Sequence, residues 1–128
     1  MSVVAAPSRP GRLAISGPRP DVHVIAVEGV LDPVVSTRLL RLVDARIRLR
    51  RLGTASTTHI VLDLTDVDSA TTSAVETLSR AADLARRNGL GLHLVGFEAV
   101  ARHLPLPARQ LVGRMSRYPD LDAALGAL

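Results

Sequence analysis

The sequence predicts a single α/β domain, in which a mixed β-sheet with parallel central strands packs against about four helices. The length of 128 residues suits one domain and is too short for two separate cores. Short β-branched and aliphatic runs alternate with segments whose apolar residues recur every three or four positions. Such alternation is typical of parallel strands joined by right-handed helical crossovers.

The first part of the chain predicts a tail, two strands and the turn between them. Residues 1–11 lack any periodicity, so we expect a flexible tail before a domain at residues 12–128. Leu13–Ser16 predicts a short strand, and Gly17–Asp21 has the composition of a turn. Val22–Val30 is rich in β-branched residues and predicts a longer strand.

A long helix and a buried strand are expected next. Asp32 suits a helix N-cap, and Pro33 suits the first helical position. Apolar residues then follow at i+4 spacing, which predicts one buried face: Val35, Leu39, Val43 and Ile47. His59–Leu64 is a nearly continuous apolar run, typical of a strand buried on both faces, and Thr65–Ala70 is expected to be a polar loop.

The second half of the chain repeats the alternation. Thr72–Arg87 predicts a helix and Leu90–Val95 a strand. Glu98–Leu104 has a short helical pattern, which Pro105 and Pro107 interrupt. Met115–Tyr118 predicts a last strand, and Pro119–Leu128 predicts a C-terminal helix.

Composition excludes several classes of protein. No run of about 18 apolar residues is present, and the N-terminus lacks the order of a signal peptide. The absence of cysteine excludes disulfides, thiolate zinc sites and cysteine nucleophiles. We therefore expect a cytoplasmic protein without membrane insertion.

The charge is basic but unevenly placed. All 16 basic residues are arginine, and residues 21–128 hold 13 of them against 12 acids, which leaves +1. A nearly neutral body with one Tyr, one Phe and no Trp argues against a dedicated nucleic-acid binder. The predicted helix at residues 33–51 nevertheless carries six arginines and one aspartate. A solvated flank, a docking face for an acidic partner and a nucleic-acid site remain open for it.

Motifs for autonomous catalysis are missing. The sequence contains no GxGxxG, no P-loop and no GxSxG elbow. Its four histidines are not spaced from one another or from carboxylates as in common metal motifs: His23, His59, His93 and His103. We expect no enzymatic activity, no metal and no cofactor.

A cluster of hydroxyls stands where the second long helix begins. Thr71, Thr72 and Ser73 follow the buried strand and the expected polar loop. The free N–H groups of a helix N-terminus stabilise a phosphate on such a hydroxyl, which would add about −1.5 to −2 charges to that face. Plain N-capping accounts for the same residue types, so both interpretations stay open.

Several segments resemble, in order and spacing, the STAS family of anti-sigma factor antagonists. The early Gly-Glu-Leu-Asp segment, the Val-Leu-Asp-Leu strand, a helix end with its following strand, and the last two helices all have counterparts. They are, in order, Val27–Asp32, Ile60–Val67, Arg87–Gly96, Val100–Leu104 and Pro119–Leu125.

The resemblance also assigns a phosphorylation loop. The family motif Asp-Ser-Ser/Thr-Gly matches Thr71, Thr72, Ser73 and Ala74, which places the phosphorylated hydroxyl on Thr72 and the next one on Ser73. A rival register at Asp68-Ser69-Ala70 would place it on Ser69 and would require a three-residue deletion.

The resemblance implies a regulatory role in transcription by partner switching. The protein would bind an anti-sigma factor that is also an ATP-dependent serine/threonine kinase, and phosphorylation at Thr72 would break the complex. Asp32 and Thr71–Ala74 would form the docking face, on a monomer or weak dimer. STAS domains also act as scaffolds of stress-sensing assemblies and as cytoplasmic subunits of lipid-transport ABC complexes. Because Thr71 replaces the Asp and Ala74 the Gly, this phosphorylation-independent alternative stays open.

Overall fold

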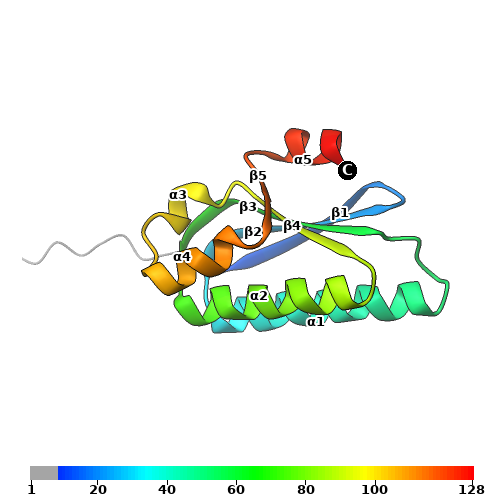
Figure 1. The fold of residues 1–128 in the computed structure, drawn as a ribbon, viewed down its shortest axis with the longest axis horizontal. Coiled ribbons are helices and arrows are strands. Elements are labelled where there is room, and N and C mark those ends of the chain that lie inside the picture. Colours follow the sequence, from blue (N-terminus) through cyan, green and yellow to red (C-terminus); the bar gives the residue numbers. More distant parts are fainter. Residues whose placement is uncertain (1–8) are drawn as a thin grey trace, which may run out of the picture.

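The computed structural model describes residues 9–128 as a five-stranded sheet with helices on both faces (Figure 1). In chain order the elements are β1 (Arg12–Arg19), β2 (Val22–Leu31), α1 (Pro33–Arg51), β3 (His59–Ala70), α2 (Thr72–Arg87), β4 (Gly91–Val95), α3 (Glu98–Ala101), α4 (Leu106–Gly113), β5 (Ser116–Tyr118) and α5 (Leu121–Ala127).

The sheet follows the chain order, β1-β2-β3-β4-β5. β1 is antiparallel to β2, and the other pairs are parallel. This arrangement confirms the predicted mixed sheet with parallel central strands. α1 and α2 lie side by side along one face, and α5 covers the other (Figure 1).

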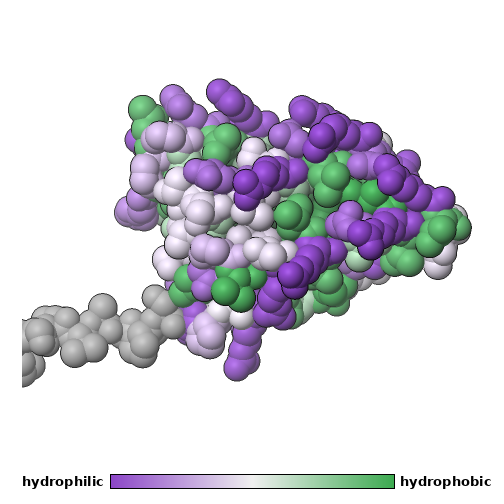
Figure 2. Space-filling view, turned by 90° about the horizontal axis from the view of Figure 1, so that it is seen from below, coloured by the Kyte–Doolittle hydropathy of each residue, from purple (hydrophilic) through white to green (hydrophobic). Residues whose placement is uncertain are grey.

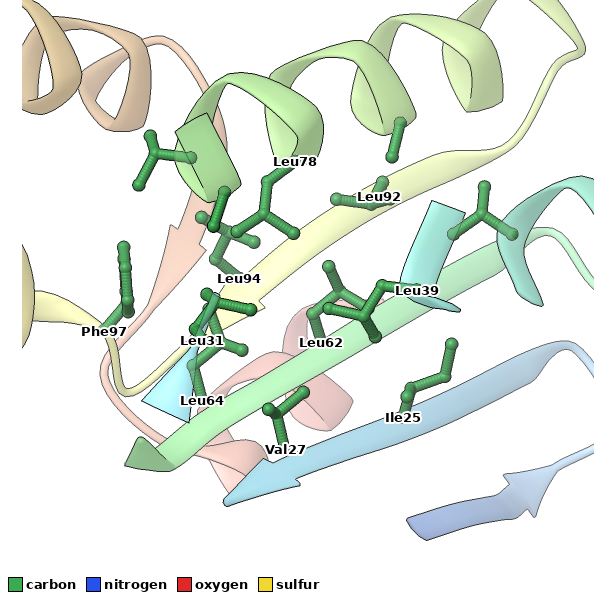
Figure 3. Close-up of a cluster of buried hydrophobic side chains, with 14 of the residues drawn as sticks. Ile25, Val27, Leu31, Leu39, Leu62, Leu64, Leu78, Leu92, Leu94 and Phe97 are labelled. Carbon is green, nitrogen blue, oxygen red and sulfur yellow. The ribbon is translucent and has the colours of Figure 1, made fainter. Parts of the chain in front are cut away.

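The larger core lies between the sheet and the pair α1 and α2. Val35, Leu39, Val43 and Ile47 are all buried, so the predicted apolar face of α1 is confirmed. The inward residues of the central strands complete this core, with Leu62, Leu64 and Leu94 beneath Leu78 of α2 (Figure 3). Burial of each such side chain contributes about 1.5–3 kcal/mol to folding.

A smaller core lies beneath α5 on the opposite face. Its buried members are Val22, Val24, Val61, Val95 and Ala124. The Arg19 guanidinium of β1 binds the C-terminal end of α5, because it donates hydrogen bonds to the carbonyls of Leu125 (3.0 Å) and Leu128 (2.9 Å). A cation is favourable there because a helix C-terminus carries partial negative charge.

Two predicted connections are strands instead. β1 continues through Gly17–Arg19, so only Pro20 and Asp21 form the turn. The predicted polar loop at residues 65–70 is wrong, because β3 continues to Ala70. The ten-residue β2 supplies backbone partners along this stretch, and the register shifts at two points let the polar side chains reach solvent.

Near proline, the helix boundaries differ from those that the sequence predicts. α3 ends at Ala101, and a separate helix, α4, begins at Leu106 with Pro107 in its first turn, where a missing N–H costs nothing. α5 begins at Leu121 rather than Pro119, because the Asp120 carboxylate accepts a hydrogen bond from the Ala123 N–H at 2.7 Å.

Part of the predicted tail lies against the sheet. Residues 1–8 fall outside the described residues. The Val30 N–H donates to the Arg9 carbonyl at 3.0 Å, which places Arg9 beside the end of β2. Within residues 9–128, no helix is long and apolar enough to cross a membrane.

Candidate functional site

Two helix starts meet at the carboxyl ends of β2 and β3. Leu31 and Ala70 are paired across these strands, and the Thr71 N–H donates to the Leu31 carbonyl at 3.1 Å. Asp32 and Thr71 follow directly, and each caps its own helix. The structure therefore brings together the two segments that the sequence predicts as a docking face, although they are 39 positions apart (71 minus 32).

Thr71 is the N-cap of α2. Its Oγ1 accepts a hydrogen bond from the Ala74 N–H at 3.1 Å and lies 3.2 Å from the Ser73 Oγ. Thr72 therefore occupies the first helical position and Ser73 the second, where backbone N–H groups have no partner inside the helix. Of the two interpretations of this cluster, capping by Thr71 is present, and it leaves Thr72 and Ser73 as the hydroxyls of the first turn.

The four residues of the predicted loop differ in accessibility. Thr71 and Ser73 are exposed, and Thr72 is half-buried. Ala74 is fully buried in the larger core. The extra Cβ at this position therefore packs inward, and the exposed part of the helix start consists of hydroxyl side chains and backbone.

Asp32 caps the N-terminus of the neighbouring helix, α1, in the same way. Its Oδ1 accepts a hydrogen bond from the Val35 N–H at 2.9 Å, and its carbonyl accepts one from the Ser36 N–H. Asp32 is half-buried, whereas the next apolar side chain, Val34, is 68% exposed. A charged cap and an exposed apolar side chain thus stand at the start of α1.

The rival phosphorylation register lies in a different environment. Ser69 is exposed and is paired with Val30 inside the sheet, before the helix start. Its neighbour Asp68 is held by Arg9, whose Nε and Nη2 donate to the two carboxylate oxygens at 3.0 and 2.9 Å. These hydrogen bonds and the positive charge hold the pKa of Asp68 below its usual range.

An open cavity of about 540 Å³ adjoins the site, and no motif in the sequence indicates it. It lies between the end of β3 and the segment around α3, where Val67 and Ala70 face Val100 and Leu104. The hydrophobic pattern of Glu98–Leu104 predicts that this segment packs against the core. Only the tertiary structure shows that a groove remains between this segment and the end of β3, beside the start of α2.

The arginine-rich helix α1 runs along the outer layer, where hydrophilic and apolar side chains alternate (Figure 2). Several of its arginines bind neighbours of this chain. Arg48 pairs with Asp44 at 2.9 Å, Arg50 donates to the Asn88 carbonyl at 2.9 Å, and Arg51 donates to the Asn88 side chain. These contacts give part of the basic charge a structural role at the helix ends.

The chain is thus a small α/β domain in which two capped helix starts lie next to each other at one edge of the sheet. The chain belongs to the STAS domain family, whose model matches residues 18–113. Its solved structural relatives include anti-sigma factor antagonists. The chain matches none of the curated protein sequences with which it was compared.

Three solved structures illustrate the likeness. An anti-sigma factor antagonist from Mycobacterium paratuberculosis is 25% identical, with a TM-score of 0.68 over 97% of both chains. The anti-sigma factor antagonist SpoIIAA in its unphosphorylated form is 15% identical, with a TM-score of 0.61 over 91% of this chain and 96% of that one. A chain of the stressosome, a signal integration and transduction hub, is 18% identical, with a TM-score of 0.62 over 89% and 94%.

Proposed function

We propose that this protein is an anti-sigma factor antagonist that binds an anti-sigma factor with ATP-dependent serine/threonine kinase activity. In this role it performs no catalysis, and the ATP site belongs to the partner. Phosphorylation of Thr72 separates the two proteins. The observation that carries the proposal is the position of Thr72 at the first turn of α2, beside the exposed cap Thr71 and the neighbouring cap Asp32.

Electrostatics supports a switch at this position. A phosphate on Thr72 adds about −1.5 to −2 charges beside the Asp32 carboxylate. The free N–H groups of the first turn stabilise the phosphate itself, so the modified domain stays folded. A partner whose surface is complementary to the unmodified edge then meets added negative charge, which costs binding free energy.

The groove beside α3 and the exposed Val34 suit the apolar part of such an interface. Interfaces combine an apolar centre with a polar rim. Here Val34 and the groove-lining Val100 would supply apolar contact, and Thr71, Ser73 and Asp32 would supply polar contact. The partner is therefore a protein surface, with an apolar side chain that enters the groove.

The test compares binding of the partner kinase to the wild type, Thr72→Glu and Thr72→Val. We expect Thr72→Val to bind like the wild type and Thr72→Glu to bind at least about ten-fold more weakly, which corresponds to 1.4 kcal/mol. Thr54→Glu is the matched control, because it adds the same charge at an exposed threonine beyond the C-terminal end of α1, and it should bind like the wild type. Wild-type affinity of Thr72→Glu would show that Thr72 is not the switch.

Phosphopeptide mapping of protein from its own host locates the modification directly. Phosphate on Thr72 supports the proposal, and phosphate on Ser73 or Ser69 keeps the switch but moves its site.

The alternative is a phosphorylation-independent scaffold, or a STAS subunit of a lipid-transport ABC complex. It is favoured by the absence of the family's acidic residue and glycine at Thr71 and Ala74. It predicts no phosphate under growth or stress and co-purification with a stress assembly or an ABC ATPase.

A further inference from the structure

Pairing between β3 and β4 brings two histidines into contact. His59 is the first residue of β3, and His93 is the third residue of β4. His59 Nδ1 lies 3.0 Å from His93 Nε2, and both side chains are half-buried. The pair lies on the α5 face of the sheet, where the His93 ring is 5.8 Å from the ring of Tyr118.

The orientation of His93 is set by a third residue. His93 Nδ1 lies 2.6 Å from Ser116 Oγ on β5. A neutral imidazole has one N–H donor and one acceptor nitrogen. When Nδ1–H donates to Ser116, the lone pair of Nε2 therefore points toward His59. Metal-binding histidines are oriented in this way by a hydrogen bond from their other nitrogen.

Because Gly91 has no side chain, the space beside His59 Nδ1 and His93 Nε2 is free of protein atoms at this position. A Cβ at this position would lie 2.7 Å from His93 Nε2 and 3.0 Å from His59 Nδ1. Gly91 is not among the described glycines with a positive φ, so alanine can adopt its backbone conformation. Glycine is therefore required at this position only because a larger side chain would collide with the two histidines. Gly91, His93 and Ser116 also line an open cavity of about 470 Å³.

We propose that His59 and His93 together bind a divalent transition-metal ion of the zinc, nickel or copper type. Metal–nitrogen bonds of about 2.0–2.1 Å at a tetrahedral ion separate the two nitrogens by about 3.3 Å, so the pair needs to open by only about 0.3 Å. Imidazole suits these metals, whereas Mg²⁺ and Ca²⁺ prefer oxygen ligands.

The protein supplies two ligands, and water completes the coordination. Within residues 9–128, no group of three or more histidine or acidic side chains is placed to hold a metal. A bound ion would connect β3 with β4 directly and with β5 through Ser116. Since the unfolded chain does not hold the pair together, the ion raises the stability of the folded state.

Calorimetric titration of the full-length protein with Zn²⁺ and Ni²⁺ tests the site, with Mg²⁺ as the control ion. We expect one ion per chain for the wild type and no site-specific binding for His93→Gln or His59→Asn. Gly91→Ala keeps both histidines but fills the space beside them, and we expect it to lose binding as well. Ser116→Ala should weaken binding by about ten-fold, as the loss of an orienting hydrogen bond does.

His103→Asn is the matched control, because it removes an exposed histidine outside the pair. It should bind like the wild type, and thermal unfolding without metal should show that each variant is folded. In ¹⁵N spectra of the imidazoles, Zn²⁺ should shift Nδ1 of His59 and Nε2 of His93. The proposal would be overturned if the wild type bound no metal, or if His103→Asn lost binding. It would also be overturned if both Gly91→Ala and His93→Gln bound the metal as tightly as the wild type.

Discussion

The two ends of the parallel strands carry different chemistry. The carboxyl ends hold carboxylates and hydroxyls, with Asp32 and Thr71 as caps of α1 and α2. The amino-terminal halves of the strands hold histidines, with His23 near the start of β2, His59 at the start of β3 and His93 in the middle of β4. Both ends belong to one sheet, but the first is assembled from helix starts, whereas the histidine pair is assembled from two facing strands.

The difference between the two ends shows which kinds of site can be recognised in a sequence. A helix cap is made by residues within four positions of each other, so Asp32-Pro33 and Thr71-Thr72-Ser73 are visible as local motifs. The histidine pair is made by residues 34 positions apart that meet only through strand pairing. Local motifs are therefore predictable, and cross-strand clusters depend on register.

The largest effect is expected for Leu31→Ala at the carboxyl ends of the strands. Leu31 is fully buried at the end of β2, directly before Asp32, and it supports the carboxyl end (Figure 3). Loss of such a side chain leaves a cavity and should lower the free energy of unfolding by about 2–5 kcal/mol. Urea unfolding measures this change. Val34→Ala, at an exposed neighbour, should change the free energy by less than about 0.5 kcal/mol, and an equal loss in both variants would contradict this account.

Removal of a cap has the next largest effect. Asp32→Ala and Thr71→Ala should each lower the free energy of unfolding by about 1 kcal/mol, because a backbone N–H loses its partner. Asp32→Asn separates the cap from docking, since asparagine caps as well as aspartate but carries no charge. If the partner recognises the carboxylate, Asp32→Asn should keep its stability and lose affinity for the kinase. Wild-type affinity would assign Asp32 to capping alone.

At the amino ends, His23 should make stability depend on pH. Burial, with a smaller contribution from Arg46, lowers the pKa of His23 below its ordinary value of 6.5. The unfolded chain then binds a proton that the folded protein does not, so stability falls as the pH drops through 6.5. Urea unfolding from pH 8 to 5 measures this slope, and His23→Gln should reduce it. An unchanged slope would show that another group is responsible.

The smallest effect is expected for Arg9→Gln. The ion pair between Arg9 and Asp68 is exposed, and such pairs contribute little to stability. We expect an unchanged midpoint of urea unfolding at physiological salt. The pKa of Asp68, followed by NMR, should nevertheless rise toward the ordinary carboxyl range, because the hydrogen bonds of Arg9 lower it. No change in this pKa would show that the hydrogen bonds are absent in solution.

Local sequence patterns were sufficient to predict the fold class, the buried face of α1 and both helix starts. Val35, Leu39, Val43 and Ile47 had to share one face because an α-helix repeats every 3.6 residues. Asp32 and Thr71 could be assigned as helix starts because a cap needs only its own backbone neighbours. These features depend on interactions over a few positions.

Other features depend on contacts between segments that are distant in the sequence, so they can be known only from the tertiary structure. β3 extends to Ala70 because β2 offers it partners, and no local pattern of residues 65–70 shows this. The burial of Ala74, the groove beside α3 and the contact of Arg9 with Asp68 likewise arise where separate elements meet. The parallel register of β3 and β4 brings His59 and His93 to 3.0 Å, because it sets Gly91 opposite His59 and leaves room for both rings.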